Sequence, residues 1–348
     1  MAKNTTLNRA KDARNDEFYT RYDDIQQELN HYEDHFKGKT VLCNCDDPFE
    51  SNFCKFFLKN FNYLGMKRLI CTSFTSSPVV GTQMAIFDYM DEPVKRGFGY
   101  VMDITEVPMK NGRGVSDDDI ERLLKSKKRG VKKLSGDGDF RSAECVEYLK
   151  QADIVVSNPP FSLFREYVAQ LMEYEKKFLI IGNQNALHYK EIFPLVQHNK
   201  VWLGYNYVKE FSKPDGTTQK FGNVLWFTNL DIDKRHEKLI LYKRYSAEDY
   251  PHYANFDGID VNRVADIPCD YDGYMGVPDS FMNSYNPDQF EIIGLGNGYL
   301  GQSIGVGRVL PEHKRQMKSH TAAGDLYYID SNDKPKVPFS RIIIRKKG

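Results

Sequence analysis

Four consecutive residues, Asn158, Pro159, Pro160 and Phe161, have the chemistry needed to hold a planar amine. The two prolines fix φ and remove two backbone N–H donors, so the chain here offers carbonyl acceptors without competing donors. The Asn158 side chain adds a further acceptor, and Phe161 provides a flat face for a ring that bears the amine. An amine whose two N–H bonds are held can aim its lone pair at an electrophile. The tetrapeptide therefore predicts group transfer to an amine; the alternative is an ordinary proline-containing turn after a strand.

Short apolar segments alternate with amphipathic segments around this tetrapeptide. Residues 153–157 are mostly apolar and predict a buried strand that leads directly into Asn158. The alternation predicts an α/β fold, with a parallel sheet covered by helices on both faces. Ligands of open parallel sheets bind beyond the carboxyl ends of the strands, which is where the tetrapeptide falls. The other predicted strands are residues 39–44, 68–72 and 177–182, and the predicted helices are residues 53–61 and 163–174.

The chain changes character near residue 240. Residues 201–207 and 223–227 flank a turn and predict an antiparallel pair of strands. After residue 242, Pro, Gly, Tyr and Asp become frequent and helical periodicity fades, until a last apolar run at residues 342–344. We therefore predict a basic N-terminal arm with an adjoining segment at residues 1–34, a catalytic domain at residues 35–240, and an irregular, mostly β module at residues 241–348.

The balance of charge excludes long-range attraction of a polyanion by the whole molecule. Lys plus Arg and Asp plus Glu both total 48 in 348 residues, so the net charge is zero. Contact with nucleic acid would have to depend on local clusters of cations. The alternative for such clusters is a solvated helix face or a frayed terminus without function. The cations that we predict to contact phosphates are Arg9, Lys11, Arg14, Lys127, Lys128, Arg129, Lys314 and Arg315.

The cysteines and the apolar runs predict a protein of the cytoplasm. Six cysteines are too few for a disulfide framework, and we interpret Cys43, Cys45, Cys54 and Cys71 as reduced thiols of the core. The Cys and His residues lack the spacing of a zinc site, so we expect no metal. No apolar run approaches the roughly 18 residues of a membrane span, and the N-terminus lacks the apolar stretch of a secretory signal.

The tetrapeptide Asn158–Phe161 resembles motif IV of the amino-methyltransferases that use S-adenosylmethionine. Phe18-Tyr19-Thr20 resembles motif X of adenine methyltransferases, which contacts the cofactor. With further segments, the chain resembles the EcoRI-type adenine-specific DNA methyltransferase family from about residue 14 to 345. This resemblance implies a Rossmann-like methyltransferase sheet with helices on both faces, and a C-terminal target-recognition module. The further segments are Asp46-Asp47-Pro48, Gly136-Asp137-Gly138-Asp139-Phe140, and residues 273–278 and 285–290.

The resemblance implies transfer of a methyl group from S-adenosylmethionine to N6 of an adenine, at a short specific sequence in double-stranded DNA. The adenine would be flipped into the pocket, where Asn158 and the Pro159 carbonyl would accept from its amine and Phe161 would stack on the base. Catalysis would then be mainly a positioning effect, with no covalent enzyme intermediate. The resemblance also implies a possible partner, a cognate restriction endonuclease that acts on the same DNA site. We expect the protein to be a monomer.

The cofactor half of the expected site departs from the superfamily pattern. Residues 44–50 contain no glycine, although these methyltransferases usually place a glycine-rich loop after the first strand. Asp46 or Asp47 could face the methionine ammonium, or could instead cap the helix that starts near Phe53. No acid follows the second strand, so Asp139 and Phe140 are preferred for the adenine end, unless residues 136–139 are only a turn. The predicted cofactor contacts are Phe18, Tyr19, Thr20, Asp46, Asp47, Pro48, Asp139 and Phe140.

Other functions share parts of this pattern. Methylation of RNA, of protein glutamine or of cytosine N4 would use similar chemistry, although cytosine-N4 enzymes more often have Ser in place of Asn158. The missing glycine loop would also fit a vestigial methyltransferase that only binds DNA. Pro268-Cys269 matches the nucleophile dipeptide of cytosine-C5 methyltransferases, but it lies far from the predicted strand ends. Residues 296–301 match the dinucleotide-binding pattern GxGxxG, but their context favours a glycine-rich hairpin or loop.

Overall fold

The computed structural model describes residues 19–46, 51–74, 99–109, 115–125, 131–212, 217–317 and 321–347. The chain divides into two compact units. The first contains the described residues up to Ala186 together with Leu203–Leu230, and the second contains Leu187–Trp202 and the described residues from Asp231 onward. The domain limits drawn from the sequence, residues 35–240 and 241–348, remain a proposal.

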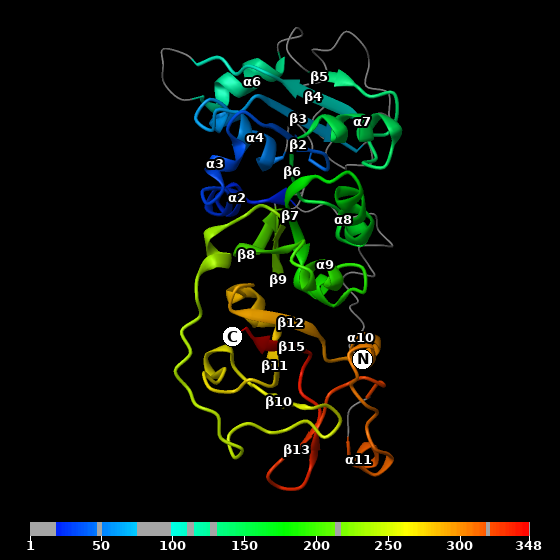
Figure 1. The fold of residues 1–348 in the computed structure, drawn as a ribbon. Helices are drawn as coiled ribbons and strands as arrows, with labels where there is room; N and C mark the ends of the chain where they lie inside the picture. Colours follow the sequence, from blue (N-terminus) through cyan, green and yellow to red (C-terminus); the bar gives the residue numbers. More distant parts are fainter. Residues whose placement is uncertain are drawn as a thin grey trace. The chain divides into compact units, whose positions relative to one another are not determined.

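A nine-stranded mixed sheet forms the centre of the first unit (Figure 1). The strand that leads into Asn158 lies near its middle, which places the tetrapeptide among the strand ends rather than at an edge. Across the sheet, the strands are β1 (Tyr19–Thr20), β8 (Trp202–Ser212), β9 (Thr218–Thr228), β7 (Lys177–Asn183), β6 (Ile154–Ser157), β2 (Thr40–Cys43), β3 (Arg68–Ser73), β4 (Tyr100–Ile104) and β5 (Val131–Lys133).

Only the central strands of this sheet are parallel. The four predicted strands are β2, β3, β6 and β7, and they pair in parallel with one another. Antiparallel strands extend the sheet on both sides, with β9 next to β7 and β4 and β5 beyond β3. The segments predicted as an antiparallel pair, residues 201–207 and 223–227, correspond to parts of the neighbouring strands β8 and β9, whereas the antiparallel strands β4 and β5 were not predicted. Local apolar runs cannot distinguish parallel from antiparallel strands, because strand direction depends on connections between distant segments.

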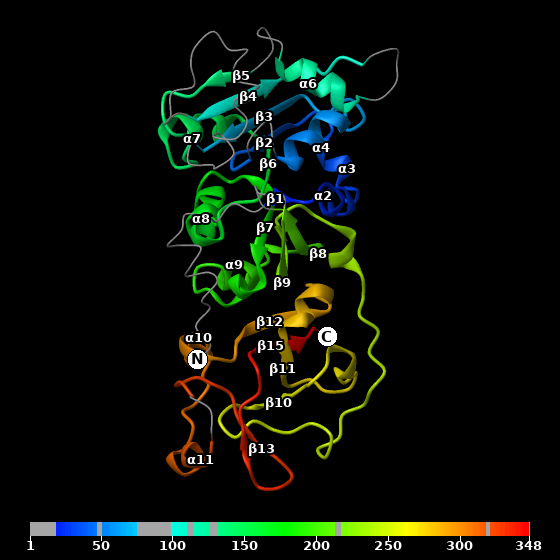
Figure 2. The same cartoon turned by 180° about the vertical axis from the view of Figure 1, so that it is seen from behind.

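Helices cover both faces of the sheet (Figures 1 and 2). Helices α2 (Tyr22–Leu29), α3 (Glu33–Phe36), α4 (Asn52–Asn60) and α6 (Asp117–Lys125) lie on one side, and α7 (Ala143–Gln151) and α8 (Phe164–Glu173) lie on the other. Two neighbouring residues of β9 show the same arrangement, since successive strand residues point to opposite faces. The Trp226 ring packs 5.8 Å from Phe53 of α4, whereas the Phe227 ring packs 5.1 Å from Phe164 of α8.

A four-stranded sheet organises the second unit. Its order is β10 (Gly258–Asp260), β11 (Tyr274–Pro278), β15 (Arg341–Lys346) and β12 (Phe290–Leu295). The apolar run at residues 342–344 lies in β15 between two partner strands, and all three isoleucines are buried. Arg341, which begins this strand, is also buried and forms an ion pair of 2.9 Å with Asp260. Because a lone buried charge is costly, each of these two groups needs the other, and the pair links β15 to β10 across the intervening strand β11.

Short elements complete the second unit. They are α9 (Phe193–Gln197), the 3-10 helices Asp233–His236, Val264–Asp266 and Asp279–Ser284, α10 (Gly298–Ser303), α11 (Pro311–Gln316), β13 (Tyr328–Ile329) and β14 (Pro335–Lys336). The prediction of a hairpin or loop at residues 296–301 is wrong, because α10 begins at Gly298. A Cβ at Gly301 would lie 2.0 Å from the Gly324 carbonyl oxygen, so this glycine allows two backbone segments to touch.

The remaining sequence expectations about the core concern cysteines and apolar helices. All six cysteines are free thiols, and Cys43, Cys54, Cys71 and Cys145 are buried. Among the described residues, no helix is both long enough and apolar enough to cross a bilayer.

Candidate functional site

The Asn158–Phe161 tetrapeptide directly follows β6 at the carboxyl end of the parallel strands. Asn158 and Pro160 are half-buried and Pro159 is buried. The N–H of Leu163 donates to the Pro160 carbonyl over 2.9 Å, and Phe161 starts a 3-10 helix, Phe161–Leu163, that leads into α8. The tetrapeptide is thus held at both ends, by the sheet and by the helix that follows it.

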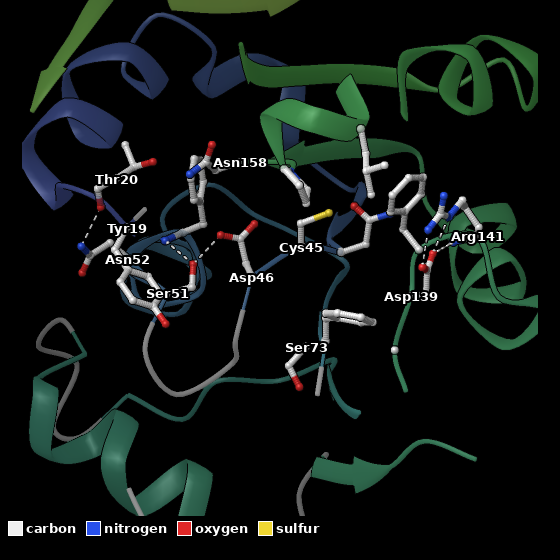
Figure 3. Close-up of a pocket in the computed structure, with 17 residues that line it drawn as sticks. Tyr19, Thr20, Cys45, Asp46, Ser51, Asn52, Ser73, Asp139, Arg141 and Asn158 are labelled. Atoms are coloured by element: carbon white, nitrogen blue, oxygen red, sulfur yellow. Dashed lines mark hydrogen bonds and ion pairs between the residues drawn. The ribbon is translucent and has the colours of Figure 1, made fainter. Parts of the chain in front are cut away.

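A pocket opens beside this tetrapeptide (Figure 3). Its volume is about 960 Å³ when the solvent space at its open mouth is included. Tyr19 and Thr20 lie on one side of it, Asp139 and Arg141 lie on the other, and Asp46 and Ser51 lie between them. The lining consists of Tyr19, Thr20, Asn44, Cys45, Asp46, Ser51, Asn52, Phe53, Ser73, Phe74, Gly138, Asp139, Phe140, Arg141, Asn158, Pro160 and Leu163.

Asp46 links three of the segments that form this pocket. One carboxylate oxygen accepts from the Ser51 hydroxyl over 2.8 Å, and the other accepts from the Ser157 hydroxyl over 2.7 Å. Ser51 is in turn the N-cap of α4, since its Oγ accepts from the Phe53 N–H. The capping role considered for Asp46 is therefore indirect. Burial raises the pKa of Asp46 to about 7, because it outweighs the hydrogen bonds from Ser157, Ser51 and the Asn158 N–H.

The raised pKa of Asp46 predicts a specific dependence of stability on pH. Between the usual pKa of 3.8 and the folded value of about 7, the folded protein keeps a proton that the unfolded chain has released. The stabilisation from this proton is complete below pH 3.8 and is lost as the pH rises through about 7. In Asp46→Asn this contribution disappears, so the free energy of unfolding should fall less than in the wild type between about pH 5 and pH 8. Denaturant titrations at both pH values test this. An equal fall in the free energy of unfolding between the two pH values, in the variant and in the wild type, would contradict it.

Asp139 and Phe140 lie at the opposite end of the pocket from Tyr19. The Asp139 carboxylate forms a two-pronged pair with Arg141, at 2.7 and 3.0 Å, and these hydrogen bonds lower the pKa of Asp139. Arg141 also bonds Glu166 over 2.7 Å. Phe140 is buried, with its ring packed edge-to-face 5.0 Å from Tyr167. An ionised carboxylate can accept hydrogen bonds from ligand hydroxyls, and a neighbouring aromatic ring can pack against a flat base.

The Tyr19-Thr20 segment forms β1, which pairs with β8 at the edge of the sheet. The Asn52 side chain donates to the Thr20 carbonyl over 2.7 Å, which ties this strand to the start of α4. The Thr20 hydroxyl is buried and has no hydrogen-bond partner among the described residues. This hydroxyl can therefore still form a hydrogen bond with a ligand in the pocket.

Phe161 does not line this pocket, although Asn158 and Pro160 do. Its ring lies 6.3 Å from the rings of both Phe211 on β8 and Phe221 on β9, and those two rings are 5.4 Å apart. Phe211 is fully buried, whereas Phe161 and Phe221 are half-buried. The tetrapeptide therefore borders the pocket through Asn158 and Pro160 and an aromatic cluster through Phe161.

Comparisons with known proteins bear on this site. A sequence profile described as "Adenine-specific methyltransferase EcoRI" matches residues 6–347, which is nearly the whole chain. The chain belongs to this family. It is therefore an enzyme, an adenine-specific methyltransferase of the restriction–modification class that acts at specific sites in DNA. No solved structure matches the chain.

Curated relatives agree with the family profile. The Type II methyltransferase M.EcoRI of Escherichia coli is 42% identical, over 91% of this chain and 100% of that protein. The Type II methyltransferase M.MpnI of Mycoplasma pneumoniae is 37% identical, over 84% of this chain and 86% of that protein. M.MgeORF184P of Mycoplasma genitalium, also named a Type II methyltransferase, is 36% identical over similar shares.

Several residues that line the pocket were not among the site residues predicted from the sequence. They include Asn44, Ser51, Asn52, Phe74 and Arg141. Ser51 carries a usable signal, because serine before an apolar helical run is a common N-cap. Phe74 directly follows β3, at the position where the family pattern would place an acidic residue, and a single aromatic residue there is not a recognisable signal. Arg141 lies two residues beyond the motif that contains Asp139, and only the folded loop brings the two together.

The cations expected to contact DNA are only partly within the described structure. Lys314 and Arg315 are exposed in the last turn of α11, and neither has an ion-pair partner among the described residues. Such cations remain available for phosphates. Nine predicted site residues lie outside the described residues: Arg9, Lys11, Arg14, Phe18, Asp47, Pro48, Lys127, Lys128 and Arg129.

Proposed function

We propose that this enzyme transfers a methyl group from S-adenosylmethionine to N6 of an adenine that has been flipped out of double-stranded DNA. The observation that carries the proposal is the pocket, which joins Asn158 to segments far apart in the sequence. Tyr19 and Thr20, Asp46, and Asp139 and Phe140 come from separate parts of the chain and all line it. These are the described parts of the segments that the sequence proposes for the cofactor and the amine.

The residues of the pocket fit S-adenosylmethionine. Asp139, with its lowered pKa, and the neighbouring Phe140 suit the ribose and the adenine ring, and the unpartnered Thr20 hydroxyl offers a further contact. Asp46 is an acid near the position proposed for the ammonium group. The bound cofactor supplies a methyl group activated on a positively charged sulfur. The task of the protein is then to bring an amine to that methyl group in the right direction.

Asn158, Pro159 and Phe161 would hold the target base. The Asn158 side chain and the Pro159 carbonyl accept from the two N–H bonds of the amine, and Phe161 stacks on the ring. Phe221 extends the aromatic surface beside Phe161. Ser157, which holds Asp46, directly precedes Asn158, so the base site and the cofactor pocket share one hydrogen-bonded network. An amine in a DNA duplex is paired and stacked, so the base must leave the helix to reach this site.

This function also assigns roles to the two parts of the chain and to its exposed cations. The first unit corresponds to a Rossmann-like methyltransferase domain, and the region from residue 241 onward is the target-recognition module. Lys314 and Arg315 bind phosphates of the duplex, and so do the basic segments outside the described residues. We further propose that the enzyme is a monomer in the cytoplasm, and that a restriction endonuclease with the same recognition sequence accompanies it.

The test is transfer of an isotopically labelled methyl group from S-adenosylmethionine to duplex DNA, followed by mapping of the modified bases. We expect N6-methyladenine at one short sequence. S-Adenosylmethionine at about 100 times its Kd should also stabilise the protein by about 2.7 kcal/mol, seen as a rise in Tm. Label in cytosine would favour N4 methylation, and label in RNA or glutamine would favour those substrates. Neither transfer nor a rise in Tm, with DNA binding retained, would favour the vestigial enzyme.

A further inference from the structure

Asn44 occupies the position where a glycine-rich loop would begin, directly after β2. It lines the pocket, and its side chain is almost completely buried, with 2% of the residue exposed. The hydroxyl of Tyr167, on α8, donates to Asn44 Oδ1. The oxygen of the Asn44 amide therefore already has a hydrogen-bond partner. The other end, Nδ2, has no hydrogen-bond partner among the described residues.

A buried amide N–H₂ group without an acceptor destabilises the free protein, so its retention calls for a ligand. No atom of the described residues accepts from Nδ2, and Asn44 lines the pocket, so a ligand bound there can supply the acceptor. An anionic acceptor suits an amide donor best, because hydrogen bonds to charged groups are the stronger ones.

The first turn of α4 provides a second preference for an anion at the same place. Ser51, Asn52 and Phe53, at the start of this nine-residue helix, line the pocket together with Asn44. The N-terminal end of a helix carries unpaired N–H groups and a partial positive charge. The first turn of α4 contains no acid of its own. Asp46 is the nearby carboxylate, and both of its oxygens already accept from serine hydroxyls.

We propose that Asn44 Nδ2 and the first turn of α4 bind the α-carboxylate of the amino-acid part of the cofactor. This inference rests on the cofactor named in the proposed function. The amide and the helix end take over the task of backbone N–H groups in a glycine-rich loop, which this chain lacks. Tyr167 is a positioning residue, since it holds Asn44 through its hydroxyl while its ring packs against Phe140. One buried side chain thus supports both ends of the cofactor site.

Two ligands that differ in the amino-acid part separate this subsite from the rest of the pocket. S-Adenosylhomocysteine contains the whole amino-acid part, whereas 5′-methylthioadenosine keeps the nucleoside and lacks both the carboxylate and the ammonium group. Of these two groups, only the carboxylate can accept from the Asn44 amide. By calorimetry, Asn44→Ala should bind S-adenosylhomocysteine about 10- to 100-fold more weakly, and 5′-methylthioadenosine within about two-fold of the wild type. Tyr167→Phe removes only the hydroxyl and should show the same selectivity, with a loss of about 3- to 10-fold.

Asn229→Ala is the matched control. Asn229 makes structural hydrogen bonds to Phe178 and Lys176 at the other end of β7 and does not line the pocket. Its replacement should leave the affinity for both ligands unchanged. Equal losses for both ligands in Asn44→Ala, or no loss for either, would overturn the carboxylate subsite. If the wild type bound neither ligand, the proposed cofactor itself would be wrong, which is a separate outcome.

Discussion

Replacement of Asn158 by alanine is expected to lower the rate of methyl transfer at least about 10³-fold, while the enzyme still binds its cofactor and duplex DNA. The side chain is proposed to accept from the amine, and that contact aligns the lone pair with the methyl group. The loop itself should keep its shape, because the adjacent prolines fix φ and Ser157 still donates to Asp46. Single-turnover rates at saturating cofactor and DNA measure the chemical step without the binding steps.

The control for this variant comes from the same loop. Ser162 is exposed and lies one residue beyond Phe161, so Ser162→Ala should transfer methyl groups at close to the wild-type rate. Full single-turnover activity of Asn158→Ala would refute the proposed contact with the amine. A loss of cofactor affinity equal to the loss of rate would instead give Asn158 a structural role in the pocket.

Gly138→Ala is expected to cause the second large loss, in both stability and cofactor affinity. Gly138 lines the pocket with a φ of +82°, a region that L-residues rarely adopt. A Cβ at this position would lie 2.0 Å from the Ser73 carbonyl oxygen, a backbone atom at the end of β3. The left-handed conformation alone costs about 1–2 kcal/mol, and the overlap must also displace the loop or the strand. Tm should fall by several degrees and cofactor affinity by at least about 10-fold, measured by thermal unfolding and calorimetry.

Gly136→Ala is the matched control within the same motif. Gly136 does not have a positive φ, and a Cβ there would meet no atom within 4 Å. Its Tm and cofactor affinity should stay close to those of the wild type. If Gly138→Ala behaved in the same way, close packing of this loop against β3 would not be a requirement of the site.

Local patterns in the sequence were sufficient for the parts of the fold that depend on short-range periodicity. The apolar runs predicted β2, β3, β6 and β7, and helical spacing predicted α4 and α8, each to within a residue or two. They predicted β8 and β9 as a neighbouring pair but not β4 and β5 on the other flank, because the direction of a strand depends on long connections. They also missed α10, since its glycines pack against the backbone at Gly324, which lies distant in the sequence.

The sequence by itself determined the family and the kind of chemistry, since residue types at short spacing, such as Asn158 to Phe161, carry that information. Only the tertiary structure decided which side chains form one pocket and what state they are in. Burial gives Asp46 its raised pKa, and the Tyr167 hydroxyl leaves Asn44 with one unused donor. Both side chains are held by contacts across more than one hundred residues of chain, since Asp46 bonds Ser157 of β6 and Asn44 bonds Tyr167 of α8. Such contacts depend on the packing of whole elements, which no local pattern encodes.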